Sequence, residues 1–512
     1  MNQDNGGIIG KLNTPTTTVA SGVWTLQDQF EAQTSSIWPL AFPQTTFTNS
    51  VRMDGDQSDD SLSRSISGVS TTKFSLSFWT KYAAPQGIGS EGPILFSSEN
   101  NSGDYIIFQL NTSNQIDFSF QGTQNRRITN RVFRDPSAFY HFLVVIDTTE
   151  STASDRLKIY VNGSQETSFA TSTTNVSQSA NISPIDETLN YSIGRYNGQS
   201  SDFCYDGYFS EFIAVYGQAL TPSSFGAFNP VTNIWEPIAY AGTYGSNGFK
   251  LNFSDSSNLG DDTSGNGNDF TVNNLTSIDQ STDTPSNNFA TMNPLTIPSG
   301  ASLTLVDGNL ALNGDSTDAG AKSTFGVSSG KWYWEIKANK GSSASDRHLV
   351  ATDIVRQITS ATDPNSQGIW GIQSRSGSGA TLNSYTNGTF SNGNSGTTGY
   401  DDNTIISVAL DMDNGKLYFA KNGTYTDLSG NTGDPANGTN PTFTGLPTDG
   451  TVLLPYVENR TASGTPSSSL NFGSPFYTIS SGNADANGHG NFEYAVPSGY
   501  FALCTKNLAE FG

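Results

Sequence analysis

Charged residues are scarce in this sequence. Asp, Glu, Lys and Arg make up 14% of the 512 residues, whereas a soluble domain usually contains about 25%. Lys and Arg are the scarcer kind, at 24 against 46 Asp and Glu, and the formal net charge is −22. This surplus of negative charge disfavours nonspecific binding to nucleic acid or to an anionic membrane. Neither is therefore expected as a partner, and Ser, Thr, Asn and Gly must cover most of the surface.

Long apolar runs are also missing. No stretch of about 18 apolar residues occurs, which is the length that a membrane-spanning helix needs. Residues 1–13 lack a positively charged region followed by an apolar segment, so no signal peptide is expected. The sequence therefore predicts neither membrane insertion nor secretion.

Cysteine and histidine are rare. The two cysteines, Cys204 and Cys504, lie far apart and fit neither a disulfide framework nor a metal knuckle. We therefore expect isolated thiols. The three histidines, His141, His348 and His489, are widely scattered, and His141 lies within an apolar run. We expect His141 in the core or at its rim rather than as a catalytic base.

Recognisable catalytic motifs are absent from the sequence. Retaining glycosidases need two carboxylates about 5–5.5 Å apart, and jelly-roll glucanases usually carry them on one strand as Glu-x-Asp-x-x-Glu. No such run occurs, and Glu211 and Glu335 stand alone in their apolar segments. A nucleophile elbow and a phosphate-binding glycine loop followed by Lys are missing too. We therefore expect a binding protein and not an enzyme, although a pair of carboxylates from different strands would form no local sequence motif.

Aromatic residues, by contrast, are abundant. The 31 Phe and 20 Tyr fall largely in short runs that alternate apolar and polar side chains, with polar turns between them. This pattern is typical of antiparallel sandwiches. The clearest predicted strands are 73–80, 104–110, 139–147, 156–161 and 208–216 in the first half, and 332–337, 368–373, 404–411, 416–420 and 452–457 in the second. The sequence thus predicts an all-β fold with two antiparallel β-sandwich (jelly-roll) domains in tandem.

A polar stretch divides the two series of strands. Residues 242–294 are rich in Gly, Asn, Asp and Ser, a composition that cannot bury a core of its own. We accordingly assign four segments to the chain. They are an N-terminal attachment segment (1–45), a first sandwich (46–236), a connector (237–295) and a second sandwich with a C-terminal cap (296–512).

The best helix candidate lies near the N-terminus, after an extended strap. Val23, Leu26 and Phe30 follow 3/4 spacing and form one apolar face, to which Trp24 adds a large anchor. A short amphipathic helix is poorly stable alone, so this face needs a surface to pack against. That surface is either the first sandwich of the same chain or another subunit or partner, and these four residues are the predicted attachment contacts.

Acidic and amide side chains cluster in one glycine-rich loop, at Asp261, Asp262, Asn266, Asn268 and Asp269. Hard oxygen ligands on a tight loop suit Ca²⁺, and the three aspartates are the candidate ligands. The spacing is not that of an EF-hand. A polar turn whose side chains bind their own backbone explains the same residues, so both interpretations stay open.

Tyrosines in polar loops are the remaining binding candidates. Aromatic faces stack on sugar rings, and neighbouring amides and carboxylates bind the hydroxyl groups. The candidates are Tyr196 and Tyr205 in the first module and Tyr385, Tyr400 and Tyr425 in the second. For each of them a purely structural role is the alternative.

The first series of strands resembles a known family. The segments Leu76–Trp79, Tyr140–Asp147, Leu157–Gly163 and Gly207–Tyr216 resemble, in order and spacing, the concanavalin A-like, laminin-G type lectin/glucanase sandwich. The resemblance covers roughly residues 50–230. It implies a jelly roll that binds a glycan or a protein surface, often with calcium.

The second series resembles a SPRY-type sandwich over roughly residues 296–480. The segments Ser329–Glu335, Val408–Asp411, Gly415–Phe419 and Leu453–Tyr456 carry this resemblance. It implies a module that binds proteins or ligands. Long insertions rich in Gly, Asn, Ser and Thr interrupt the second module, so the binding loops of that family cannot be transferred to this chain.

The whole arrangement resembles structural proteins of marine tailed phages. The resemblance is carried by Leu12–Pro15, Ser21–Trp24, Gly248–Phe253, Asp262–Asp269 and Thr284–Phe289. It implies a virion surface protein, assembled in the host cytoplasm, whose N-terminal segment attaches to other virion proteins while the sandwiches project outward.

Three functions follow as hypotheses. The first is a tail fibre or spike that adheres to a glycan or protein of the host surface. The second is a capsid decoration protein (head fibre), and the third is a polysaccharide depolymerase tailspike. Symmetric homo-oligomers are the default for such proteins, and a trimer is expected, although no heptad run predicts a coiled coil.

Overall fold

The structure is a computed structural model that describes residues 46–512 with several internal gaps. The gaps are 56–59, 84–91, 100–103, 184, 186–188, 197–203, 231, 315–318, 340–346, 356–367, 376–381, 394–398 and 461–466. The predicted attachment helix, with Val23, Trp24, Leu26 and Phe30, lies outside the described residues. Within them, regular structure is almost entirely β, with one α-helix, α2 (Thr505–Phe511). The predicted all-β class is confirmed.

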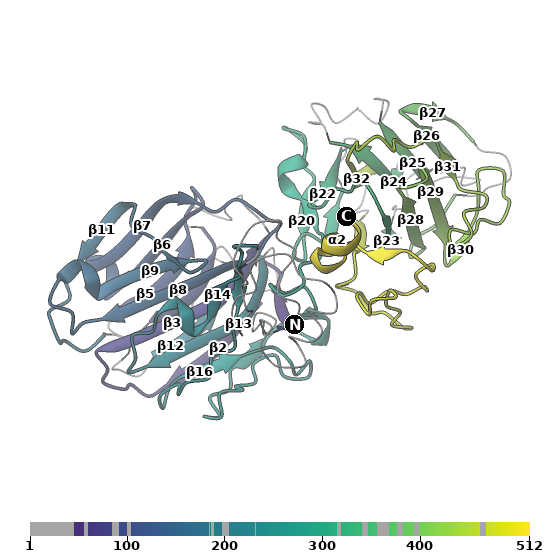
Figure 1. The fold of residues 1–512 in the computed structure, drawn as a ribbon. Coiled ribbons are helices and arrows are strands. Elements are labelled where there is room, and N and C mark those ends of the chain that lie inside the picture. The colour runs from purple at the N-terminus through teal and green to yellow at the C-terminus, as the bar shows by residue number, and fades with distance from the viewer. Residues whose placement is uncertain are drawn as a thin grey trace, which may run out of the picture. The chain divides into compact units, whose positions relative to one another are not determined.

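The first sandwich consists of two antiparallel sheets (Figure 1, purple to teal). One sheet contains, in spatial order, β10 (Ser164–Gln165), β9 (Leu157–Val161), β8 (Tyr140–Asp147), β3 (Lys73–Tyr82), β13 (Gly207–Tyr216), β1 (Ser50–Met53) and β18 (Gln280–Ser281), with β16 (Phe249–Leu251) beside β13. The other contains β11 (Phe169–Thr174), β7 (Asn125–Val132), β6 (Gln115–Phe120), β5 (Tyr105–Leu110), β4 (Ile94–Glu99), β12 (Leu189–Ile193), β2 (Ser61–Ile66) and β17 (Thr271–Asn273).

Aromatic rings fill the space between these two sheets. Phe78 of β3 stacks on Phe212 of β13 with ring centroids 4.7 Å apart, and it meets Phe108 of the opposite sheet edge-on at 5.2 Å. All three side chains are fully buried. Burial of one such side chain stabilises the fold by about 1.5–3 kcal/mol. The Phe residues that alternate with polar residues along the strands therefore form the core of this sandwich. The dipeptide Asn162–Gly163, with positive φ at both residues, makes the tight turn between β9 and β10, as its type-I′ preference requires.

Residues 237–295, which the sequence presented as a connector, contribute strands to the first sandwich. β16 pairs with β13, β17 with β2, and β18 with β1. The cause of the pairing is the apolar/polar alternation of β16. Phe249 and Leu251, on either side of Lys250, are fully buried in the core. The polar stretch therefore has no core of its own but adds edge strands to an existing one.

The second sandwich also has two sheets (Figure 1, green). One contains, in order, β19 (Met292–Asn293), β22 (Ala319–Ser323), β32 (Leu453–Arg460), β24 (Arg347–Ile354), β25 (Ile369–Arg375), β26 (Leu382–Thr386) and β27 (Thr389–Ser391). The other contains β20 (Thr304–Val306), β21 (Ala311–Asn313), β33 (Ser467–Asn471), β23 (Lys331–Asn339), β28 (Ile405–Asp411), β29 (Lys416–Lys421) and β30 (Thr424–Tyr425), with β31 (Phe443–Thr444) beside β29 and β34 (Phe501–Ala502) beside β23.

The C-terminal residues complete the second sandwich. β34 pairs in parallel with β23 at Trp332 and Tyr333, and α2 follows it directly. The ring of Phe501 stacks on that of Phe511 at 3.8 Å. The C-terminal residues thus add a strand (β34) and a capping helix (α2) to the second sandwich.

Residues 221–242 belong to a separate compact unit. Within it, β14 (Gly226–Phe228) and β15 (Trp235–Pro237) form an antiparallel pair, and the rings of Phe228 and Trp235 lie 5.0 Å apart. None of the described helices is long and apolar enough to cross a membrane.

Candidate functional site

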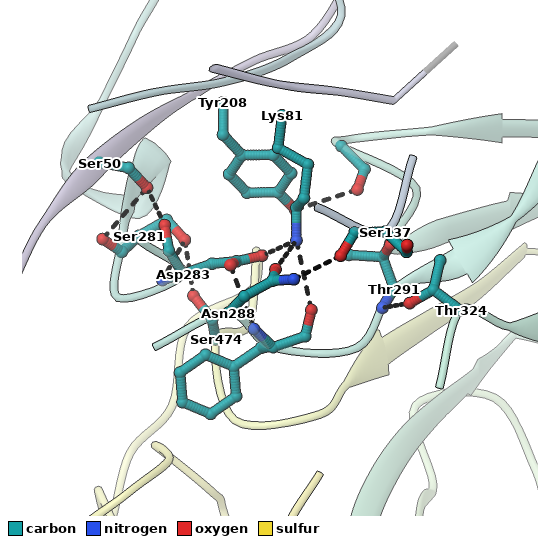
Figure 2. Close-up of polar contacts among 12 residues, drawn as sticks. Ser50, Lys81, Ser137, Tyr208, Ser281, Asp283, Asn288, Thr291, Thr324 and Ser474 are labelled. Atoms are coloured by element: carbon teal, nitrogen blue, oxygen red, sulfur yellow. Dashed lines mark hydrogen bonds and ion pairs between the residues drawn. The ribbon is translucent and has the colours of Figure 1, made fainter. Parts of the chain in front are cut away.

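A buried lysine lies at the centre of a polar cluster near the end of the connector. Lys81, near the end of β3, is 1% exposed. Its Nζ makes an ion pair with Asp283 and donates hydrogen bonds to Asn288 Oδ1 at 2.8 Å and to the carbonyl oxygen of Phe289 at 3.2 Å. Figure 2 shows the lysine pointing toward both side chains. The three protons of the ammonium group thus have three acceptors, as a buried cation requires.

Aromatic rings enclose this ammonium group. Nζ lies 4.8 Å from the ring centroid of Tyr208 and 5.5 Å from that of Phe139, distances at which a ring attracts a cation. Burial lowers the pKa of Lys81 despite the neighbouring carboxylate. Burial likewise raises the pKa of Asp283, against the opposing effect of Lys81. Both shifts favour the uncharged forms, because desolvation penalises charge.

The segment Ser281–Phe289 is fixed to the rest of the chain on several sides. Asn288 Nδ2 donates to the carbonyl oxygen of Ser137, and its backbone N–H donates to Thr505 Oγ1 at 3.0 Å. Ser281 Oγ hydrogen-bonds to Ser474 Oγ at 2.7 Å, as Figure 2 shows. The motif Thr284–Phe289, which carried part of the phage resemblance, therefore forms a buried joint. We call Lys81, Asp283 and Asn288, with the segment 281–289, the polar joint.

Three of the five candidate tyrosines are buried, so their assignment as ligand contacts is wrong. Tyr205, Tyr385 and Tyr400 are 0%, 4% and 2% exposed. The hydroxyl of Tyr205 hydrogen-bonds to Thr80 Oγ1 at 2.5 Å, and that of Tyr400 donates to the carbonyl oxygen of His348 at 2.6 Å. Their rings have no face left for a sugar, because strands and loops around them close over the aromatic surface.

The other two tyrosines, Tyr196 and Tyr425, are partly exposed. Burial raises the pKa of both, and for Tyr196 the neighbouring Glu99 adds to the rise. An aromatic residue that the sequence analysis missed is more accessible. Phe390 on β27 is 37% exposed, and its ring packs on that of Tyr385 at 5.2 Å. The Asn387–Gly388 turn before it is the signal that could have found it, since such a turn indicates a hairpin.

The acidic loop uses its oxygen atoms within the protein. Asp262 Oδ1 accepts from the backbone N–H groups of Lys250 and Ser264, both at 2.9 Å, and its Oδ2 accepts from that of Asn268 at 2.8 Å. Asp269 Oδ1 accepts from the N–H of Asp262 at 3.0 Å. Burial and the nearby carboxylates raise the pKa of Asp261. Within the described residues, no three acidic, histidine or cysteine side chains are arranged to hold a metal ion. The geometry favours the turn over the calcium site.

The isolated carboxylates of the two sandwiches have structural partners. Glu211 lies at a bulge of β13, with φ of 49°, and makes an ion pair with Lys250 at 3.0 Å. Glu335 on β23 is fully buried and accepts hydrogen bonds from Tyr333, Asn471 and two backbone N–H groups. The arrangement gives each carboxylate a role in folding.

The histidine and thiol predictions have clear outcomes. His141 is fully buried, its Nε2 lies 2.9 Å from Ser77 Oγ, and burial lowers its pKa to about 3. This confirms a core histidine. Cys204 and Cys504 are both buried, and neither is part of a disulfide, as predicted. Burial raises the pKa of Cys504 to about 11, which disfavours the reactive thiolate.

Part of the chain matches the model of a known protein family. Residues 55–224 match the family model described as the concanavalin A-like lectin/glucanases superfamily. The match confirms the predicted concanavalin A-like sandwich over this range. No curated protein matches the sequence significantly.

Similar solved structures include two SPRY domains and a pentraxin. The SPRY domain of human HERC1 is 16% identical, with 35% of this chain and 96% of that chain covered and a TM-score of 0.26. The heptameric SAP-like pentraxin from Limulus polyphemus is 12% identical, with 35% and 80% covered and a TM-score of 0.26. The TRIM65 PSpry domain is 14% identical, with 36% and 91% covered and a TM-score of 0.25.

Proposed function

We propose that this chain is a surface protein of a tailed-phage virion, of the tail-fibre or spike type, that adheres to a glycan or protein of the host surface. The lectin/glucanase family match over residues 55–224 supports a binding role. The virion assignment rests on the sequence resemblance of Leu12–Pro15, Ser21–Trp24 and Thr284–Phe289 to marine phage structural proteins. A homo-oligomer, expected as a trimer, is part of the same proposal.

The observation that carries the proposal is the polar joint. Connectors between independently moving domains are usually exposed and polar, whereas Asp283 and Asn288 are 1% and 8% exposed and bind Lys81 of the first sandwich. A pre-organised binding protein loses less conformational entropy on binding than a flexible one. A stiff, buried joint therefore suits a protein that must present binding surfaces away from its attachment point.

The proposed contact for a sugar is the surface around Phe390. Its ring is 37% exposed on β27, and the neighbouring Thr386, Thr389 and Asn392 are exposed polar residues. A ring flanked by hydroxyl and amide groups is the combination that binds the apolar face and the hydroxyl groups of a sugar. Binding without catalysis agrees with the structural roles of Glu211 and Glu335.

Replacing Phe390 with Ala is expected to weaken binding to a responsive glycan roughly two- to tenfold, because one aromatic contact contributes about 0.5–1.5 kcal/mol. The measurement is a titration on an array of oligosaccharides, followed by calorimetry on the glycan that responds best. Phe228→Ala is the matched control, since Phe228 is also an exposed phenylalanine, at 45%, but lies on β14. Equal losses in both variants, or an unchanged Kd for Phe390→Ala, would contradict this contact.

Immunogold labelling of purified particles tests the virion assignment. We expect label on the tail, and loss of label when residues 1–45 are deleted from the phage-encoded chain while the purified remainder still binds host cells. Label on the head would instead identify a capsid decoration protein, and particles without label would refute both. Oligosaccharide released from host capsule by the purified chain would identify a depolymerase.

A further inference from the structure

The polar joint brings together the three groups that a transamidation needs. These are a primary amine (Lys81), a carboxamide (Asn288) and a carboxyl group (Asp283), and all three side chains are buried. The amine nitrogen lies 2.8 Å from the carboxamide oxygen. Because a C=O bond is about 1.23 Å long, the carboxamide carbon is within about 4 Å of the amine, close to the separation of about 3–3.5 Å at which bound groups react. The carboxyl group of Asp283 contacts the same nitrogen.

The surroundings of these groups favour their uncharged forms. Amines in water are protonated at neutral pH and do not attack amides, but Lys81 lies among the rings of Tyr208 and Phe139, where water is excluded. Burial lowers the pKa of Lys81 and raises that of Asp283. A proton can therefore pass from the ammonium group to the carboxylate, which leaves a neutral amine beside a neutral acid.

We propose that Lys81 and Asn288 become joined by an intramolecular isopeptide bond, with Asp283 as the proton carrier. The neutral amine of Lys81 attacks the side-chain carbonyl carbon of Asn288, and a new N–C bond forms. Asp283, which holds the proton taken from the ammonium group, donates it to the departing amide nitrogen and then accepts a proton from the attacking nitrogen. The bond between the carbonyl carbon and that nitrogen breaks, and ammonia leaves. No oxidant, cofactor or activated donor is required, because one amide replaces another.

Hydrogen bonds favour Asn288 over Asp283 as the group that is attacked. The amide nitrogen of Asn288 donates to the carbonyl oxygen of Ser137, so its oxygen, and not its nitrogen, faces Lys81. Asp283 is held by the N–H of Phe289 at 3.1 Å through its other oxygen and stays free to exchange protons with Lys81. Asp283 becomes a carboxylate, which is a poor electrophile, each time it gives up its proton, whereas the carboxamide of Asn288 carries no charge that would repel a nucleophile at any stage.

The bond would join residues 207 positions apart in the sequence. It would tie β3 to the segment 281–289 and close most of the first sandwich into one covalent loop. A crosslink of this span restricts the unfolded chain, and it would keep the joint intact under load or after a proteolytic cut inside the loop. This inference does not depend on the proposed adhesion function.

Mass spectrometry of the purified full chain tests the proposal. We expect an intact mass lower than the sequence mass by one ammonia. Since a succinimide at an Asn–Gly pair also loses ammonia, a peptide map must decide. The map should contain a branched peptide that holds Lys81 and Asn288, with no tryptic cleavage after Lys81. Cleavage after Lys322, whose buried Nζ pairs with Asp353 at 2.9 Å, is the internal control.

Three variants separate the roles of the three residues. Lys81→Arg, Asn288→Ala and Asp283→Asn should each yield the full sequence mass and no branched peptide. An unmodified wild-type chain with normal cleavage after Lys81 overturns the proposal. This outcome does not depend on whether any variant folds. Loss of water instead of ammonia would place the bond on Asp283 and overturn the assignment to Asn288. A branched peptide that persists in Asp283→Asn would overturn the role of Asp283 as proton carrier.

Discussion

Replacing Glu335 with Ala is expected to destabilise the second sandwich by about 3–5 kcal/mol, the cost of leaving several buried donors without their charged acceptor. Glu335 is fully buried. Its Oε1 accepts from the hydroxyl of Tyr333 and the N–H of Tyr494, both at 2.8 Å. Its Oε2 accepts from the N–H of Glu493 at 2.9 Å and from Asn471 at 3.3 Å. Urea unfolding monitored by tryptophan fluorescence measures the loss, because Trp332 and Trp334 lie on the same strand.

Glu335→Gln provides the control for charge and shape. A glutamine retains the volume but turns an NH₂ group toward two of the four donors, so we expect an intermediate loss. A Gln variant as stable as wild type at pH 7 would show that the four hydrogen bonds do not need two acceptor oxygens. An Ala variant that loses under about 1 kcal/mol would refute the structural role itself.

The pH dependence of this difference has a defined sign. Burial raises the pKa of Glu335 above its ordinary value of 4.5, although the hydrogen bonds oppose the rise. The folded state therefore binds the proton more tightly than the unfolded state does. The proton-linked part of the stability that Glu335 contributes is fully present below pH 4.5 and is lost as pH rises through the folded-state pKa, while the hydrogen bonds to its two oxygens remain. The stability of wild type relative to Glu335→Gln should decrease across that interval, and an increase would contradict the direction of the shift.

Much of the fold follows from local pattern. The predicted strand 208–216 is β13 to within one residue, and 404–411 and 416–420 are β28 and β29. In each of these segments, apolar residues either alternate with polar ones or form a continuous run. Both patterns can be recognised from neighbouring residues alone. The all-β class of the fold was predictable for the same reason.

The site was less predictable because it depends on distant pairs. Tyr385 and Tyr400 lie beside polar, glycine-rich insertions in the sequence, and their local context indicated exposed loops. Their burial arises from elements far away, such as His348, whose carbonyl oxygen accepts from the Tyr400 hydroxyl across 52 positions. No local pattern encodes such a contact.

The polar joint illustrates the same limit most clearly. Lys81 and Asp283 are separated by 202 positions, and each one alone is an ordinary charged residue. The only local sign was a lysine at the end of the long apolar strand KFSLSFWTKY. The connector is polar, as its composition indicated, but polarity does not imply exposure. Polar residues at a joint can be buried when every donor has an acceptor.

Replacing Asp283 with Leu is expected to cost about 3–5 kcal/mol, because it leaves the Lys81 ammonium buried without its counter-ion. The double variant Lys81→Met, Asp283→Leu should recover most of that loss, since apolar groups of similar volume can replace a buried pair. Both are best measured in an Asn288→Ala background, in which the proposed isopeptide bond cannot form. Urea unfolding of the background, of each single variant (Asp283→Leu and Lys81→Met) and of the double variant then gives the coupling between the two charges alone.

The pH response of Asp283→Leu distinguishes a buried charge from a loss of packing. Burial already lowers the pKa of Lys81, and removal of the carboxylate removes the main opposing effect. The unfolded state then binds the proton more tightly than the folded state does, so the stability of this variant should rise with pH below the ordinary lysine value of 10.5. The double variant has no such proton and should show no such rise. If both variants respond alike, or if the double variant is as unstable as the single one, the joint is held by shape and not by its charges.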